Sequence, residues 1–140
     1  MPARILIVDD NSVARTTIRA LLDWHSFQVC GEAKDGYEAI EKVIELRPEL
    51  VLLDINMPGL NGVKAAYEIR RISPATKIVF LTMHDTPAVV QGVRLWAHGL
   101  VSKSAAGTEL IPTLNRLIGI PGEEPPGKPA KPKSRRAAAE

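Results

Sequence analysis

The chain of 140 residues has the length of one ordinary domain, and its composition, 45% hydrophobic and 24% charged, is globular rather than disordered or fibrous. Its formal net charge is +2, but residues 1–120 contain 13 basic and 13 acidic side chains, so the basic excess lies entirely in residues 121–140. This balance argues against a folded domain that presents a basic face to nucleic acid.

Cysteine usage and the absence of long apolar runs indicate the compartment. Cys30 is the only cysteine in the sequence, so neither an intrachain disulfide nor a cysteine-based zinc site is expected. The first apolar run, 5–8, stops at Asp9-Asp10, and no run approaches the roughly 20 apolar residues that span a bilayer. We therefore expect a soluble, cytoplasmic protein without a membrane partner.

Short apolar runs predict the strands of a sheet. Residues 5–8, 50–53 and 77–81 are almost continuously apolar and contain β-branched residues. Continuous apolarity is typical of strands that are covered on both faces of a parallel sheet. The runs 27–30 and 99–102 predict two shorter, more peripheral strands.

Segments with helical periodicity alternate with these runs. They are 12–22, 39–44, 63–70, 88–97 and 108–118. We expect Ser12 to cap the first helix and Thr108 the last, with Pro112 in or just past the first turn of that last helix. Arg47-Pro48 ends the second helix, because the residue before a proline avoids helical backbone.

The alternation of strand and helix, repeated five times, predicts an α/β fold with a doubly wound, five-stranded parallel sheet and helices on both faces. From Pro121 onward the sequence is rich in proline and charge and has no aliphatic side chain larger than alanine. We therefore expect one folded domain over 1–120 and a disordered, Pro-rich basic tail or linker over 121–140.

Polar side chains follow the predicted strands at the edge where doubly wound sheets bind ligands, outside the carboxyl ends of the strands. They are Asp9 and Asp10 after the first strand, Asp54 after the third, Thr82 after the fourth and Lys103 after the fifth. Three converging carboxylates repel one another unless a cation joins them. Their hard oxygen ligands favour Mg²⁺.

Carboxylates, Mg²⁺, a hydroxyl group and a lysine together suit phosphoryl transfer, which needs positioning and neutralisation of the phosphoryl oxygens. Asp54, at the end of the central strand, is the expected nucleophile. Lys103 and Thr82 would each contact a phosphoryl oxygen, and the backbone carbonyl of Asn56 would supply a further metal ligand.

These residues sit in motifs that resemble the receiver domain of two-component response regulators. The motifs are Ile5–Asp10, Asp54–Gly59, Leu81–Asp85 and Val101–Ala105, and the last two resemble most the receivers of NarL/FixJ-type transcription factors. The resemblance covers about residues 3–119. It implies a flavodoxin-like (βα)5 fold with strand order 2-1-3-4-5.

The resemblance also implies a function. Asp54 would accept a phosphoryl group from a sensor histidine kinase. Asp10, Asp54 and the Asn56 carbonyl would bind Mg²⁺ directly and Asp9 through water, while Thr82 and Lys103 would report the phosphoryl group to a distant face. The chain would then be a switch and not an enzyme, apart from catalysing its own phosphorylation and dephosphorylation.

That face, formed by the fourth helix, fifth strand and fifth helix, would control an output partner or a DNA-binding domain, and it is where a homodimer would form. The residues of this chain would not themselves bind nucleic acid.

Some positions depart from the family pattern. Leu100 stands where the family usually has an aromatic residue, and Thr82 and Lys103 are one residue closer than is common. Trp96 replaces a small residue, either as core filling or as an exposed anchor, and Ser104 replaces a proline that follows a cis bond. Met83 and His84 flank the site, where we expect ordinary loop packing.

Two alternatives stay open at this point. A pseudo-receiver would act by constitutive dimerisation or binding, which the leucine at position 100 and the shortened fourth unit allow. A Mg²⁺-dependent phosphohydrolase would use Asp54 as nucleophile, but such enzymes need a second acid two residues later, and Asn56 cannot serve as a general acid or base.

Overall fold

The computed structural model describes residues 2–57, 59–83 and 97–119. In chain order the elements are β1 (Arg4–Val8), α1 (Ser12–Trp24), β2 (Gln28–Ala33), α2 (Gly36–Leu46), β3 (Leu50–Asp54), α3 (Gly62–Ile72), β4 (Lys77–Thr82), β5 (Gly99–Ser102), a short 3₁₀ turn η1 (Lys103–Ala105) and α5 (Ala106–Ile118). The strands pair in parallel in the order β2-β1-β3-β4-β5, which confirms the predicted topology.

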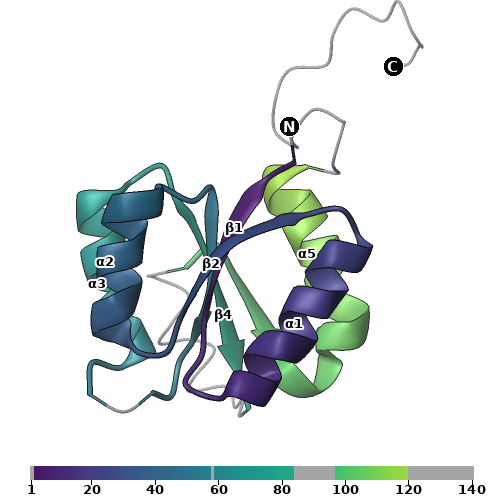
Figure 1. Ribbon diagram of the computed structural model, residues 1–140, viewed down its shortest axis with the longest axis horizontal. Helices are drawn as coiled ribbons and strands as arrows, with labels where there is room; N and C mark the ends of the chain where they lie inside the picture. The colour runs from purple at the N-terminus through teal and green to yellow at the C-terminus, as the bar shows by residue number, and fades with distance from the viewer. Residues whose placement is uncertain (1, 58, 84–96, 120–140) are drawn as a thin grey trace, which may run out of the picture.

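Helices cover both faces of this sheet. Helices α2 and α3 lie on one face and α1 and α5 on the other, as Figure 1 shows with the sheet seen nearly edge-on between them. None of the described helices is both long enough and apolar enough to cross a bilayer. The predicted helix over 88–97 falls almost entirely outside the described residues, as does the predicted tail over 121–140.

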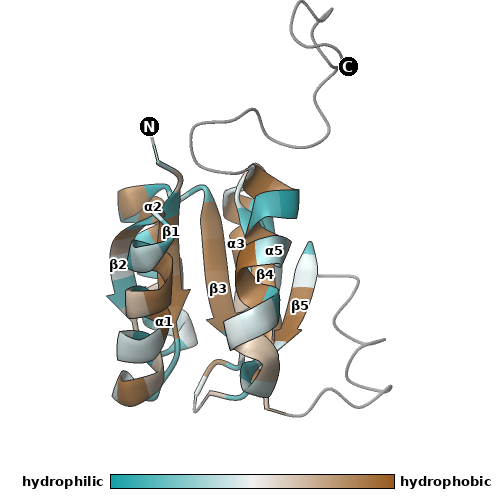
Figure 2. Cartoon of the chain, turned by 90° about the vertical axis from the view of Figure 1, so that its right-hand side faces the viewer, coloured by the Kyte–Doolittle hydropathy of each residue, from teal (hydrophilic) through white to brown (hydrophobic). Residues whose placement is uncertain are grey.

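The central strands are apolar throughout because their side chains alternate between two cores. Leu6, Leu53 and Phe80 pack toward α2 and α3, whereas Ile7 and Leu52 pack toward α1 and α5. All five are fully buried. The brown central strands in Figure 2 show this apolarity, which is the expected signature of a parallel sheet covered on both sides.

Three local expectations were wrong. Asn11, not Ser12, caps α1, and its side-chain oxygen accepts a hydrogen bond from the Ala14 N–H at 2.9 Å. Helix α5 begins at Ala106, so Thr108 lies inside the helix and Pro112 falls in its second turn. The β2 strand is peripheral, as predicted, but its six residues make it one of the longer strands of the sheet.

The end of α2 agrees with the sequence. The helix stops at Leu46, and Arg47 takes up left-handed backbone (φ 49°) directly before the buried Pro48. At this amino-terminal edge of the sheet, the Thr76 hydroxyl donates to the Pro48 carbonyl at 3.1 Å and lies 2.6 Å from the Ser73 hydroxyl.

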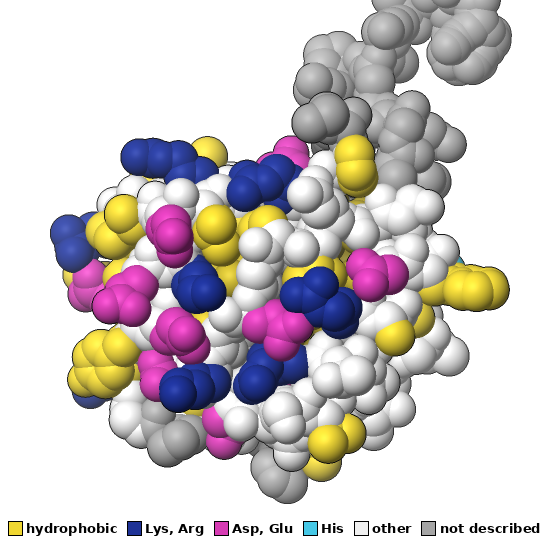
Figure 3. Space-filling view, viewed as in Figure 1, with side chains coloured by type: hydrophobic (Ala, Val, Ile, Leu, Met, Phe, Trp, Pro, Cys, Tyr) yellow, Lys and Arg dark blue, Asp and Glu magenta, His cyan; other side chains and the backbone are white. Residues whose placement is uncertain are grey.

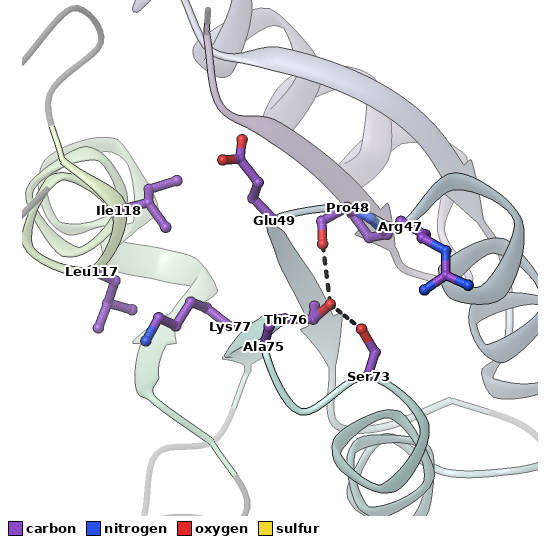
Figure 4. Close-up of a pocket in the computed structure, with 9 residues that line it drawn as sticks. All are labelled: Arg47, Pro48, Glu49, Ser73, Ala75, Thr76, Lys77, Leu117 and Ile118. Carbon is purple, nitrogen blue, oxygen red and sulfur yellow. Dashed lines mark hydrogen bonds between the residues drawn. The ribbon is translucent and has the colours of Figure 1, made fainter. Parts of the chain in front are cut away.

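A hollow of about 430 Å³ lies beside these bonds, between the α2–β3 loop, the α3–β4 loop and the end of α5 (Figure 4). It lies at the opposite edge of the sheet from Asp9, Asp54, Thr82 and Lys103, the candidate site residues that end or follow the strands.

One glycine is required where α3 meets β3. The Gly62 N–H donates to the Ile55 carbonyl at 2.9 Å, and a Cβ added at Gly62 would overlap the Asp54 carbonyl oxygen and lie 2.7 Å from Ile55 Cα. Both obstacles are backbone atoms of the segment that carries Asp54. The glycine therefore lets the helix approach the candidate nucleophile.

Replacing Gly62 by alanine should therefore be costly. We expect Gly62→Ala to lower the free energy of unfolding by about 1–3 kcal/mol, because backbone must move to admit the methyl group. Gly107→Ala is the matched control: a Cβ there meets nothing within 4 Å, and we expect stability to be unchanged or to rise by up to about 1 kcal/mol. Urea unfolding measures both, and equal effects would contradict this account of Gly62.

Candidate functional site

The fold brings the predicted site residues to one edge of the sheet. Asp9 directly follows β1, Asp54 is the last residue of β3, Thr82 the last of β4, and Lys103 directly follows β5. These four strands are consecutive neighbours in the sheet and run in parallel, so their carboxyl ends meet. Thr82 is 1% exposed and pairs with Ser102 at the end of β5.

Asp9 is fully buried, and three neighbours hold its backbone N–H and its carboxylate. Its backbone N–H donates to the Ala33 carbonyl at 3.0 Å, which ties the end of β1 to β2. One side-chain oxygen, Oδ1, accepts from the Asn11 N–H at 2.9 Å, and the other, Oδ2, lies 2.7 Å from Lys103 Nζ. A carboxylate without solvent is stable only with such partners.

Asp54 shares the same lysine. Its side chain is almost completely buried, Oδ1 accepts from the Asn56 N–H at 3.1 Å, and Oδ2 lies 3.3 Å from Lys103 Nζ. The ammonium group of Lys103 thus bridges two buried carboxylates.

The electrostatics of this cluster follow from the geometry. Burial and the neighbouring Asp9 carboxylate raise the pKa of Asp54 to about 6, against the opposing effect of Lys103 and the Asn56 N–H. Burial lowers the pKa of Lys103, but the two carboxylates raise it by more, so the net direction is upward and the ammonium keeps its proton. The cluster therefore holds more negative charge than one lysine balances.

The carboxylates suit a divalent cation. Asp9, Asp10 and Asp54 each offer a carboxylate oxygen, and these oxygens lie within 4.8 Å of one another. The donors are hard oxygens only, and the exposed Asp10 opens the cluster to solvent. Both properties fit Mg²⁺, which binds through a few carboxylates and retains water. Asn56 follows in the adjoining loop, where its N–H already contacts Asp54.

The positions that depart from the family pattern have ordinary surroundings where the structure describes them. Leu100 is half-buried beside Phe80 in the sheet register and packs on the α2–α3 core. Met83, which flanks the site, is 63% exposed, so the loop packing expected for its side chain is not observed. The Lys103–Ser104 bond is trans, since no cis peptide occurs among the described residues. His84 and Trp96 lie outside them.

Two residues of α1 and its cap that the sequence analysis did not relate to this site contact Asp9. Asn11 donates its N–H to the carboxylate, and Arg15 donates from its guanidinium to the Asp9 carbonyl at 2.7 Å. The distance of Asn11 from Asp9, two residues, is a recognisable turn signal. The Arg15 contact depends on how α1 leaves the sheet, and no pattern in the sequence indicates it.

The elevated pKa of Asp54 makes a prediction about stability. The folded chain binds this proton up to about pH 6, whereas the unfolded chain releases it near the ordinary aspartate pKa of 3.8. Stability therefore falls as the pH rises through this window, and above it the ionised Asp54 is destabilising. Without divalent cations, we expect Asp54→Asn to raise the free energy of unfolding at neutral pH by on the order of 2 kcal/mol.

The gain should shrink as the pH falls from about 6 toward 4, since wild-type Asp54 is then protonated. Glu41→Gln removes an exposed carboxylate from α2 and should have little effect at either pH. Urea unfolding at both pH values provides the comparison. A gain for Asp54→Asn that did not depend on pH would show that its charge is not the cause.

Comparisons with known proteins agree with this site. The response regulator receiver domain family matches residues 5–115. The chain is 34% identical over 118 residues to the chemotaxis protein CheY of Thermotoga maritima, covering 84% of this chain and 98% of CheY. It is 36% identical over 117 residues to the response regulator GacA of Pseudomonas viridiflava, covering 82% of this chain but 54% of GacA, so it spans about half of that relative.

Solved structures give the same result. A LuxR-family two-component response regulator from Aurantimonas sp. SI85-9A1 superposes with a TM-score of 0.76 at 33% identity, covering 80% of this chain and 81% of that chain. The receiver domain of the putative response regulator NarL from Mycobacterium tuberculosis gives a TM-score of 0.74 at 32% identity, covering 81% and 93%. The resemblance drawn from the motifs is thereby confirmed. The chain belongs to the response regulator receiver domain family, the phosphoacceptor switches of two-component signalling.

Proposed function

We propose that Asp54 is the phosphoacceptor of this receiver and that Asp9, Asp10, Asp54 and the Asn56 carbonyl form its Mg²⁺ site. The observation that carries the proposal is the buried Asp54 carboxylate, which ends the central strand within 3.3 Å of Lys103 Nζ and beside two further carboxylates. When bound, Mg²⁺ would neutralise charge on the phosphoryl oxygens.

The transfer itself is a displacement at phosphorus. A carboxylate oxygen of Asp54 forms the new O–P bond, the bond from phosphorus to the donor breaks, and the leaving group takes the electron pair. The donor is the phosphohistidine of a sensor histidine kinase, whose imidazole leaves. Asp54 must be ionised to attack, and Lys103 favours that form because its ammonium lies beside the Asp54 oxygen.

Lys103 and Thr82 would act after the transfer. The ammonium of Lys103 already contacts two carboxylates, so it can follow negative charge onto a phosphoryl oxygen without leaving the site. Thr82 ends the adjacent strand and would donate its hydroxyl to a second phosphoryl oxygen. Movement of these two groups would bias the face of β5 and α5, together with the helix predicted over 88–97, between two packings.

The partners follow from this scheme. The kinase would dock on α1 and the loop after β5, and Val13, 71% exposed in the first turn of α1, offers apolar surface there. The partner that receives the signal would be an output protein, a second copy of the chain, or a DNA-binding domain attached through residues 121–140.

We further propose that residues 1–120 form the whole receiver. It would act in the cytoplasm as a switch rather than an enzyme, and it would not itself bind nucleic acid.

Labelling tests the phosphoacceptor directly. With acetyl phosphate and Mg²⁺ we expect one phosphoryl group per chain, detected by intact mass, and none in Asp54→Asn or after chelation of the metal. Glu41→Gln should label like the wild type. A single phosphorylation that persists in Asp54→Asn would refute the assignment, and many turnovers on a small phosphomonoester would instead support the phosphohydrolase alternative.

The switch is tested by molar mass in solution. We expect beryllofluoride, which mimics the phosphoryl group, to change the mass measured by size exclusion with light scattering in the wild type and to leave Asp54→Asn unchanged. The reason is that only a charged group on Asp54 draws Lys103 and Thr82 inward. An identical dimer with and without beryllofluoride would favour the pseudo-receiver.

A further inference from the structure

The guanidinium group of Arg15 joins the candidate metal site to the edge strand of the sheet. Arg15 lies in the first turns of α1, and its Nη1 donates to the Asp9 carbonyl at 2.7 Å while its Nε donates to Glu32 Oε1 at 2.9 Å. Its side chain is 19% exposed, so these bonds form in a partly desolvated place where they are stronger than on an open surface.

Glu32 braces this arginine from the other side. It lies in β2, one residue before Ala33, and its second oxygen accepts from Arg19 Nε at 2.7 Å. Arg15 and Arg19 are one helical turn apart, so both reach the same carboxylate. The hydrogen bond from Arg19, with help from Arg15, keeps the pKa of Glu32 below its usual value despite partial burial, and the brace stays anionic.

Basic and acidic side chains are interleaved over the face that α1 and β2 present (Figure 3), so an ion pair there is unremarkable by itself. The contact with Asp9 distinguishes Arg15 from its neighbours. Arg19 donates to Glu32 from a side chain that is 40% exposed, and this bond does not reach the site.

The Asp9 carbonyl matters because it belongs to the peptide that joins Asp9 to Asp10. The Asp9 N–H is fixed by Ala33 and its carboxylate by Asn11 and Lys103. Arg15 fixes the remaining polar group of the residue, the carbonyl. The plane of the Asp9–Asp10 peptide sets the direction in which the exposed Asp10 side chain leaves the backbone, and hence the spacing of the carboxylate cluster.

We propose that Arg15, braced by Glu32, is a positioning residue that holds the Asp9–Asp10 peptide in the orientation that binds Mg²⁺. This inference rests on the proposed function of the carboxylate cluster. The role needs an arginine, because two different nitrogens of the rigid guanidinium group donate to two acceptors, the Glu32 carboxylate and the Asp9 carbonyl. A lysine keeps the charge but has one terminal nitrogen in place of the guanidinium group.

This difference gives a matched pair of variants. Arg15→Lys and Arg19→Lys conserve the same charge on the same helix, but only the first alters the contact with the Asp9 carbonyl. We expect the dissociation constant for Mg²⁺ to rise about 5- to 10-fold in Arg15→Lys and less than about 2-fold in Arg19→Lys, a loss typical of groups that orient metal ligands. Mg²⁺ titration of the whole chain, followed by backbone amide shifts in NMR spectra, measures both constants without any phosphoryl donor.

Urea unfolding without Mg²⁺ separates positioning from general stability. We expect Arg15→Lys, which loses the partly desolvated bond to the Asp9 carbonyl, to be somewhat less stable than Arg19→Lys, and both variants to stay folded during the Mg²⁺ titration. Glu32→Gln keeps the shape of the Glu32 side chain without its charge, and it should weaken Mg²⁺ binding as Arg15→Lys does. This second variant keeps the test valid if Arg15→Lys fails to fold. Wild-type affinity in Arg15→Lys, or an equal loss in both lysine variants, would overturn the inference. A wild-type chain that does not bind Mg²⁺ would refute the proposed metal site as well.

Discussion

The interaction on which the site depends is the sharing of one ammonium group by two buried carboxylates. Lys103 Nζ lies 2.7 Å from Asp9 and 3.3 Å from Asp54, and neither carboxylate is accessible enough for water to take the place of the lysine. Two negative charges face one positive charge in this space. The imbalance explains the raised pKa of Asp54 and gives a second cation a favourable place beside Asp10.

The rest of the fold holds this unfavourable arrangement together. Desolvation of Asp54 destabilises the chain, and the apolar strands on either side supply the compensating stability because both of their faces are buried. Gly62 lets α3 pack directly on the Asp54 carbonyl, and Ala33 ties the Asp9 N–H to β2. Backbone contacts from different elements thus hold the two carboxylates close together, although their negative charges repel each other.

Features that repeat along the chain were predictable from the sequence, and features that depend on a single contact were not. The alternation of apolar runs predicted the parallel sheet, and the polar residues after those runs predicted a site at their carboxyl ends. The prediction of the α1 cap was wrong because Asn11 and Ser12 are both good capping residues, and the neighbouring backbone decides between them. The start of α5 was missed because η1 leads into it without a side-chain cap. The Arg15 contact spans three elements, which local patterns do not encode.

If Asp54 is the phosphoacceptor, as proposed, Lys103 also couples phosphorylation of Asp54 to binding of the cation. A phosphoryl group on Asp54 adds negative charge and attracts Lys103, which weakens the contact of its ammonium with Asp9. Asp9 is fully buried, so it then gains more from a cation nearby than it does in the unphosphorylated chain. Coupling between two sites is reciprocal, so a cation that favours the phosphorylated state must itself bind that state more tightly. In this view Arg15 contributes to both equilibria, because it holds the backbone of the residue from which the lysine departs.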